Sequence, residues 1–288
     1  MKLTAIMPVR NEQWVLGLSA RACLEWCDEL IVLLHRSTDR SAGILEEIRH
    51  ELPAEKRILS AASDDERWRE MDHRQSLLTV ARNGGATHIA LVDADEVLCG
   101  DSLPRVRAIS EALKPGECLN VRMHCMWRGL HQYRVDQSSV WSNRRDLALV
   151  FRDKPELHWT AENGYHHHAR APKGAKPSGD QTLGVMHLQF ADWRRLTAKH
   201  ALYKVRERID YPDKPVGHIE SMYNMALDEQ YLETRYAPRQ WTEIYREKDW
   251  LRYVDFNDTP WQEAEARRLF VGRGPLFRGL NLFGVCAQ

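Results

Sequence analysis

The 288-residue sequence lacks a surplus of charge of either sign, because 41 Lys and Arg balance 41 Asp and Glu. A neutral chain has no global field that draws it to nucleic acid or to an anionic membrane, although it can still carry a local basic patch. Long apolar runs are also missing, since none approaches the roughly 20 residues of a membrane-spanning helix. The start, Met1-Lys2-Leu3-Thr4, leads directly into a strand pattern and not into a signal peptide. We therefore expect a cytoplasmic protein, either free or attached peripherally to the inner face of the membrane.

Disulfide frameworks and internal repeats are absent too. The six Cys have no framework-like spacing, which predicts reduced thiols. Cys23 and Cys27 lie one helical turn apart and are expected in the core. We expect a catalytic α/β domain over residues 1–190 and a helical region over 191–288 that packs on this core and could contact an acceptor.

What the sequence does have is an alternation of apolar runs and amphipathic segments over its first hundred residues. Strands are expected at 3–9, 30–34, 57–60 and 88–92, and helices at 13–26, 40–48 and 70–83. Gly84 and Gly85 are a normal stop for the last of these helices. The order βαβα predicts a doubly wound, mostly parallel sheet of the α/β class.

The second half of the chain is less regular. Further strands are expected at 119–127, 148–152 and 183–189, a helix at 103–113, and two or three helices within 221–269. The stretch 172–180 contains two Pro, two Gly and two Lys and reads as a mobile loop. A helix over 193–209 carries a basic face that is either solvated or directed at an anionic substrate. The glycine-rich end, 272–284, is expected to pack back on the body.

Three carboxylates, Asp93, Asp95 and Glu96, directly follow the fourth apolar run. Carboxylates this close repel one another, and a hard divalent cation such as Mg²⁺ or Mn²⁺ that also holds a phosphate would gather them. The alternative is an ordinary solvated turn. The position of the cluster favours a cation site over a solvated turn, because open α/β sheets bind ligands at the carboxyl ends of their strands.

With these elements in order, residues 3 to 210 resemble the family-2-type glycosyltransferases of the GT-A fold. The resemblance rests on Pro8-Val9-Arg10-Asn11-Glu12, on Ser37-Thr38-Asp39, on Arg74 in a helix before Gly84-Gly85, on Asp93-Ala94-Asp95-Glu96 as the Asp-x-Asp motif, and on Met186-His187-Leu188. Arg36 stands where the family usually has Gly.

This resemblance implies a metal-dependent, hexosyltransferase-like enzyme that moves a sugar from a nucleotide-diphosphate sugar, first of all a UDP-sugar, to an acceptor hydroxyl, with inversion. The implied cofactor is Mn²⁺ or Mg²⁺, with Asp95 as the main ligand and His187 and Asp93 beside it. The residues expected to contact the nucleotide sugar are Pro8, Arg10, Asn11, Glu12, Asp39, Arg74, Asp93 and Ala94. Two of these roles have structural alternatives: His187 could be a core histidine, and Asp39 could cap a helix.

An inverting transferase also needs a base that takes the proton of the acceptor hydroxyl. Glu162 is the first candidate, and His166 and His167 follow. The three consecutive His at 166–168 also suggest zinc, but neighbouring side chains of a strand point to opposite faces, so three in a row cannot easily share one ion.

Other functions fit the same residues less well. The chain could be a catalytically inactive module that binds nucleotide sugars, glycans or nucleic acid. A nucleotidyltransferase would need glycine in the first loop, and residues 7–12 have none. A phosphatase with an Asp-x-Asp motif would carry it after the first strand and not after the fourth. The sequence leaves the acceptor open between a glycan, a lipid-linked sugar and a modified nucleic acid.

Overall fold

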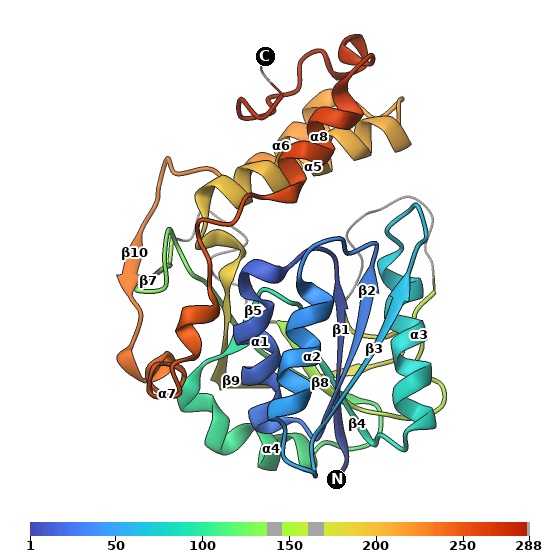
Figure 1. Ribbon diagram of the computed structural model, residues 1–288, viewed down its shortest axis with the longest axis vertical. Helices are drawn as coiled ribbons and strands as arrows, with labels where there is room; N and C mark the ends of the chain where they lie inside the picture. The colour runs from blue at the N-terminus through green and yellow to red at the C-terminus, as the bar shows by residue number, and fades with distance from the viewer. Residues whose placement is uncertain (137–145, 161–169, 287–288) are drawn as a thin grey trace. The chain divides into compact units, whose positions relative to one another are not determined.

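The computed structural model describes residues 1–136, 146–160 and 170–286, which form two compact units (Figure 1). The first unit comprises Met1–His124, Arg144–His187 and Pro238–Asp255, and the second comprises Cys125–Asn143, Leu188–Ala237 and Phe256–Gln288. The division is therefore discontinuous along the chain, whereas the sequence predicts a single boundary at residue 190.

The first unit is built on a mixed eight-stranded sheet with the strand order β3-β2-β1-β4-β8-β6-β9-β5. Its strands are β1 (Leu3–Val9), β2 (Glu29–His35), β3 (Arg57–Ser63), β4 (His88–Leu91), β5 (Glu96–Leu98), β6 (Glu117–Cys125), β8 (Leu147–Arg152) and β9 (Lys176–His187). Two further strands, β7 (Gln132–Arg134) and β10 (Thr234–Tyr236), form an antiparallel pair in the second unit.

The α-helices of the first unit are α1 (Gln13–Trp26), α2 (Ser41–Glu51), α3 (Glu70–Asn83), α4 (Leu103–Glu111) and α7 (Glu243–Glu247). Those of the second unit are α5 (Trp193–Asp210), α6 (Val216–Asn224) and α8 (Trp261–Phe270). Short 3₁₀ segments are η1 (Gly100–Ser102), η2 (Leu188–Phe190), η3 (Arg239–Trp241), η4 (Trp250–Tyr253) and η5 (Gly274–Phe277).

The α/β class and the βαβα order predicted from the sequence are confirmed. β1 pairs in parallel with β2 and β4, and β2 pairs in parallel with β3. The other half of the sheet adds antiparallel pairs, β4 with β8, β8 with β6, and β5 with β9. β9 begins at Lys176, so the prediction of a mobile loop over 172–180 is wrong for its second half. Sheet pairing here overrides the local Gly and Pro content, because context commonly outweighs strand propensity.

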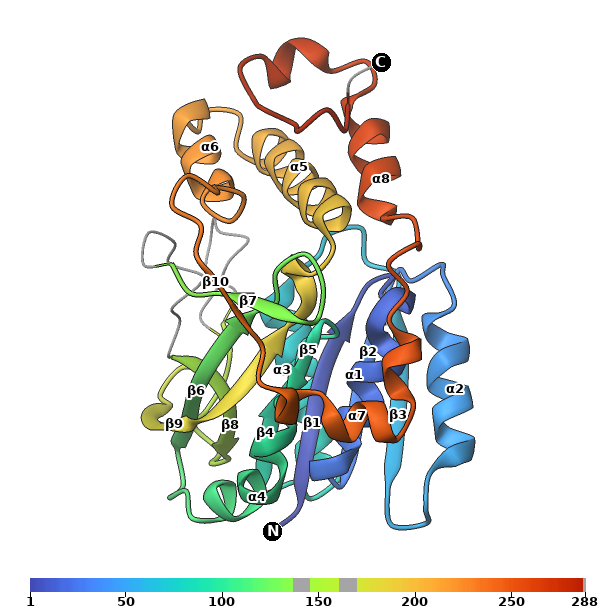
Figure 2. The ribbon, with the colours of Figure 1, turned by 90° about the vertical axis from the view of Figure 1, so that its left-hand side faces the viewer.

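Helices cover the parallel strands. α1 and α2 lie side by side along them (Figures 1 and 2). α3 packs Leu77 and Leu78 against Ile6, Ile31 and Ile89 in one buried cluster. Every residue of β1 is buried, as expected for a strand with neighbours on both edges and both faces.

The acidic turn lies at the carboxyl edge of the parallel strands. The amide of Val92 donates to the carbonyl of Ile6 in β1 at 3.4 Å, and the amide of Glu96 closes the turn on the carbonyl of Asp93 at 3.0 Å. The chain then leaves β4 and enters β5, which pairs with β9 and not with β4. The predicted position of the cluster at a strand end is therefore confirmed.

In the second unit, four of the six Lys and Arg residues of α5 are paired with acidic side chains. Arg194 pairs with Glu263, Arg195 with Asp258, and Arg206 with Glu265. The fully buried Lys204 pairs with Glu220 at 2.9 Å. These ion pairs join α5 to neighbouring elements, so four of its basic side chains already have acidic partners within the protein.

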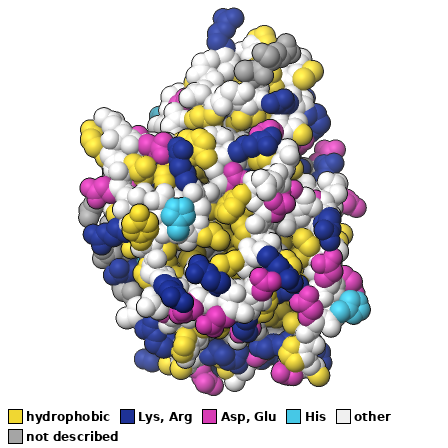
Figure 3. Space-filling view, turned by 60° about the vertical axis from the view of Figure 1, so that its left-hand side comes forward, with side chains coloured by type: hydrophobic (Ala, Val, Ile, Leu, Met, Phe, Trp, Pro, Cys, Tyr) yellow, Lys and Arg dark blue, Asp and Glu magenta, His cyan; other side chains and the backbone are white. Residues whose placement is uncertain are grey.

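The glycine-rich tail packs on the same helix, within the second unit. Phe277, Leu282 and Val285 share a buried cluster with Leu202 and Val205 of α5. Within the described ranges no helix is both long enough and apolar enough to span a bilayer. On the face shown in Figure 3, basic and acidic side chains are interspersed, in keeping with the balanced charge of the sequence.

Two helix glycines provide a matched test of the packing. A Cβ built on Gly17 of α1 would lie 2.8 Å from Cβ of Tyr253 in η4, whereas a Cβ on Gly43 of α2 would meet nothing within 4 Å. We expect Gly43→Ala to raise the free energy of unfolding by about 0.5–1 kcal/mol, because Ala is the better helix former. Gly17→Ala should lower it by about 1–3 kcal/mol through overpacking. Urea unfolding of both variants measures the difference, and equal effects would contradict the packing described at Gly17.

Candidate functional site

Two arginine side chains bind the acidic turn after β4. Nη1 of Arg170 lies 2.9 Å from Oδ2 of Asp93 and 2.7 Å from Oε1 of Glu96, while its Nη2 lies 2.5 Å from Oε2 of Glu96. Nη2 of Arg74 in α3 lies 3.0 Å from Oδ1 of Asp93 and 2.8 Å from Glu70. The two guanidinium groups thus supply part of the positive charge that the sequence assigned to a metal ion.

The pKa values of the cluster follow from these contacts. Burial alone would raise the pKa of Asp93, but Arg170 and Arg74 outweigh it and lower that pKa. Burial raises the pKa of Glu96 above its usual value, in spite of the opposing effect of Arg170. Burial would lower the pKa of Arg74, yet Asp93 and Glu70 raise it. Asp93 is therefore held as a carboxylate by its two arginines.

Asp95 has a different partner, His187, at the end of β9. Nε2 of His187 lies 3.4 Å from Oδ1 of Asp95, and both side chains are largely buried. The position of His187 is set by the sheet, because β5 and β9 pair with Glu96 directly opposite His187. The structure thus brings His187 to the turn that contains Asp93, Asp95 and Glu96, although His187 comes from a distant part of the sequence.

The loops that follow β1 and β2 are joined by Asn11. Its side-chain oxygen accepts from the amides of Thr38 and Asp39 at 2.7 and 3.3 Å, and its own amide donates to Oγ of Ser37. Asn11 has φ of 53°, a left-handed conformation that Asn tolerates better than most residues. Arg36 also takes this conformation, with φ of 45°, at the position where the resembling family has Gly.

The carboxylate of Asp39 links the starts of two helices. Its Oδ2 accepts from the amide of Gln13, the first residue of α1, and its Oδ1 accepts from the amide of Ser41, the first residue of α2. First-turn amides have no partner within their own helix, so a carboxylate stabilises both ends. Asp39 thus has a structural role, and further lone pairs remain on both oxygens for a ligand.

The other predicted residues of the first loop and turn are placed nearby. Glu12 accepts from Nε1 of Trp14 at 2.6 Å, and Pro8 is buried in β1. Arg10 is half-buried and close enough to His35 for its charge to lower the pKa of that imidazole, after burial as the main cause. Ala94 is buried between the two aspartates of the turn.

The three predicted base candidates, Glu162, His166 and His167, lie outside the described residues. The zinc alternative for 166–168 falls in the same stretch. Arg170, which the sequence did not single out, follows this stretch directly in the chain. Charge balance is the only signal in the sequence that bears on Arg170, because a cluster of carboxylates requires cationic partners. With 41 basic residues, however, the sequence does not show which of them pair with the cluster.

The residues present fit a divalent cation that is shared with a substrate. The described part of the chain contains no group of three or more His, Cys, Asp or Glu side chains placed to hold a metal on their own. Oδ1 of Asp95 and Nε2 of His187 lie 3.4 Å apart, and this separation is close to the roughly 3 Å between neighbouring ligand atoms of an ion bound at about 2.1 Å. Mg²⁺ and similar ions are commonly held by one or two carboxylates together with substrate phosphates.

A second buried cluster, which the sequence also did not indicate, lies at the end of β2. The rings of His35, Trp68 and His73 contact one another, with centroids 4.9 to 5.2 Å apart. Both histidines are buried. Burial, together with the neighbouring His35 as the next cause, lowers the pKa of His73 to about 4.

Replacing Arg170 tests the charge compensation at the acidic turn. We expect Arg170→Met to lower the free energy of unfolding by about 3–5 kcal/mol, because it leaves the buried Glu96 without its partner and removes one of the two partners of the half-buried Asp93. The matched control is Arg40→Met, which breaks an exposed ion pair with Glu47 and should cost about 0–1 kcal/mol. Denaturant unfolding at pH 7 measures both, and similar losses would show that Arg170 does not compensate the cluster.

The lowered pKa of His73 predicts a pH dependence of stability. In the unfolded chain this imidazole takes up a proton near its ordinary pKa of 6.5, and in the folded chain only near 4. The unfolded state therefore binds more protons between these values, and stability falls as the pH drops from about 6.5 to about 4. His73→Phe should flatten this decline, whereas exposed His218→Phe should not. Thermal unfolding between pH 7 and pH 4 distinguishes them, and an unchanged slope in His73→Phe would refute the assignment.

Comparisons with known proteins give a weak similarity at the level of the fold. No protein-family model matches the sequence, and curated protein sequences give no match. Among solved structures, TarS from S. aureus (residues 1–349) is similar with a TM-score of 0.47 and 13% identity over 99% of this chain and 87% of that one. The same TarS fragment with UDP gives a TM-score of 0.48 at 13% identity over 99% and 87%. The mannosyltransferase PcManGT from Pyrobaculum calidifontis, in complex with GDP-Man and Mn²⁺, gives 0.45 at 13% over 97% and 76%. At such identities and TM-scores, the function of this chain has to be argued from its own residues.

Proposed function

We propose that this chain is a glycosyltransferase of the GT-A fold and of family-2 type, which transfers a sugar from a nucleotide-diphosphate sugar to an acceptor hydroxyl. The observation that carries the proposal is the meeting of Asp93, Asp95, Glu96 and His187 at the carboxyl edge of the parallel strands. Ligands of open α/β sheets bind at this edge. The donor we expect first is a UDP-sugar.

Charge supports a site for a cation and a diphosphate. With all carboxylates ionised, Glu70, Asp93, Asp95 and Glu96 carry four negative charges against the two of Arg74 and Arg170. This carboxylate-rich turn suits one Mn²⁺ or Mg²⁺ ion, with Asp95 and His187 as its ligands and Asp93 beside them. Such an ion would neutralise the charge that develops on the departing diphosphate.

The residues of the chain have separate tasks in this proposal. Arg170 and Arg74 fix the carboxylate of Asp93 in place, so the turn is organised before a donor binds. Nη1 of Arg74 is buried and has no hydrogen-bond partner among the described residues, which leaves a donor group for a phosphate oxygen. The loop residues Pro8, Arg10, Asn11, Glu12, Asp39 and Ala94 would contact the nucleotide, with Asn11 holding the two loops together.

Our proposal for the catalytic base and the acceptor rests on the sequence and not on contacts among the described residues. A base has to take the proton of the acceptor hydroxyl as the sugar is transferred with inversion. Glu162 is our first candidate, followed by His166 and His167. The acceptor itself is a glycan, a lipid-linked sugar or a modified nucleic acid.

Nucleotide release tests the proposal directly. Pure protein incubated with UDP- and GDP-sugars and Mn²⁺ should slowly release free nucleoside diphosphate, and a chelator should stop it. Asp95→Asn should lower metal-dependent donor binding by at least about tenfold, because it removes one charged ligand, about 1.4 kcal/mol or more. Its fold should be retained.

The control is Asp213→Asn, which changes an exposed carboxylate of the second unit. It should bind the donor like the wild type in titration calorimetry. Donor binding without turnover would favour the inactive binding module. The absence of both binding and turnover with every donor would refute the proposal, and wild-type affinity in Asp95→Asn would refute the ligand assignment.

A further inference from the structure

The end of the sequence contrasts with the neutral charge of the whole chain. Residues 267–288 include four Arg and no Asp or Glu, so the first 266 residues carry four more acidic than basic side chains. We call residues 267–286 the basic tail. A local basic surplus of this kind acts on its surroundings even when the net charge of the protein is zero.

Half of these arginines are already engaged. Arg267 donates to the carbonyl of Val285, and Arg268 pairs with Glu265. Arg273 and Arg278 are exposed, and their side chains have no hydrogen-bond or ion-pair partner within the described ranges. Val271, just before them, is 74% exposed. The basic tail therefore presents two uncompensated cations beside exposed apolar surface.

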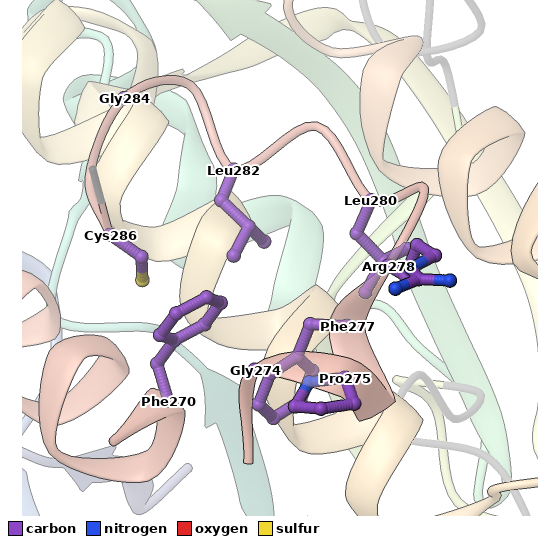
Figure 4. A pocket seen from close by; sticks show the side chains of 9 residues that line it. All are labelled: Phe270, Gly274, Pro275, Phe277, Arg278, Leu280, Leu282, Gly284 and Cys286. Carbon is purple, nitrogen blue, oxygen red and sulfur yellow. The ribbon is translucent and has the colours of Figure 1, made fainter. Parts of the chain in front are cut away.

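A cavity of about 470 Å³ opens beside Arg278, and Arg273 directly precedes its lining residue Gly274 in the chain. Its lining is apolar apart from one arginine, and consists of Phe270, Gly274, Pro275, Phe277, Arg278, Leu280, Leu282, Gly284 and Cys286. In Figure 4 the side chains of Phe270, Leu282 and Cys286 face one another, and Arg278 lies to one side with its guanidinium directed away from them. The size falls within the roughly 300–1,000 Å³ of sites for small organic ligands.

Acidic side chains near the tail do not compete with an anionic ligand. Glu265 is neutralised by Arg206 and Arg268, and Glu220 pairs with Lys204 and accepts from the amide of Asn281. The two exposed arginines therefore face outward with their charge undiminished.

We propose that the basic tail binds an anionic phospholipid surface, with one acyl chain in the cavity and Arg273 and Arg278 on the headgroup phosphates. We choose an anionic phospholipid as the ligand because of charge complementarity: an apolar cavity next to unpaired cations matches an amphiphile with an anionic headgroup. A single inserted chain binds weakly and reversibly, and neighbouring basic residues supply the second attraction needed for attachment. This inference is independent of the proposed transfer reaction.

Vesicle sedimentation of the full chain tests the surface. The protein should sediment with mixed phosphatidylcholine and phosphatidylglycerol vesicles, only weakly with pure phosphatidylcholine, and less as salt rises. Replacing Arg273 and Arg278 together by Ala should lower partitioning about 25-fold, since each basic residue near such a surface contributes about fivefold. The matched control replaces Arg57 and Arg235, two exposed arginines outside the tail, and should bind like the wild type.

Filling the cavity tests the acyl chain separately. A Cβ built on Gly274 would meet the ring of Phe270 at an ordinary 3.8 Å, so Gly274→Leu can extend into the space without changing charge. It should lower vesicle binding by about fourfold for each methylene it excludes, while the melting temperature confirms folding.

The proposal would be overturned if the protein sedimented equally with and without phosphatidylglycerol in the vesicles, or if the double arginine variant sedimented like the wild type. So would a Gly274→Leu variant that binds vesicles like the wild type. If that variant loses binding of free decanoate in solution but keeps vesicle binding, the cavity takes a soluble amphiphile, and the proposed insertion of a lipid acyl chain is refuted.

Discussion

The structure of the site depends on the compensation of Asp93 and Glu96 by Arg170 and Arg74. Without these guanidinium groups, the half-buried Asp93 and the buried Glu96 would repel each other in a place where water screens their charges only in part. Because Arg170 forms a fork on both acids, it also fixes their orientation, which a mobile point charge would not do. Charge compensation and geometry are thus supplied by the same contacts, and the turn can hold its shape before any ligand arrives.

In the loops and in the second unit, polar side chains also form contacts that stabilise the fold. Asn11 and Asp39 use their side chains to satisfy backbone amides of neighbouring loops and helix starts, so the groups expected to meet a nucleotide also stabilise the fold. In the second unit, ion pairs between α5 and its neighbours Glu263 and Glu220 neutralise a helix that reads as strongly basic in the sequence. The charge of a helix face in the sequence therefore does not predict its ligands until the ion-pair partners within the protein are known.

Much of the fold could be predicted because it is encoded locally. The spacing of apolar residues marks helices 13–26 and 70–83 at the observed bounds, and the strand before Asp93 ends at Leu91, one residue before the expected end. Contacts between distant residues could not be read in this way. Arg170 meets Asp93 across 77 positions, and the rings of His35 and His73 meet because β2 and α3 are neighbours. β9 starts earlier than expected because sheet pairing, which is not a local property, extends it to Lys176.

The pairing of β5 with β9 restricts how this part of the chain can change in length. Glu96 and His187 are directly opposite, as are Leu98 and Val185, while Val97 and Met186 point to the other face. A single inserted or deleted residue in β9 would exchange the two faces and bring an apolar side chain opposite Glu96. A change of two residues would keep the side-chain alternation. Length variation in this strand is therefore compatible with the site only in even steps, unless a bulge absorbs the odd residue.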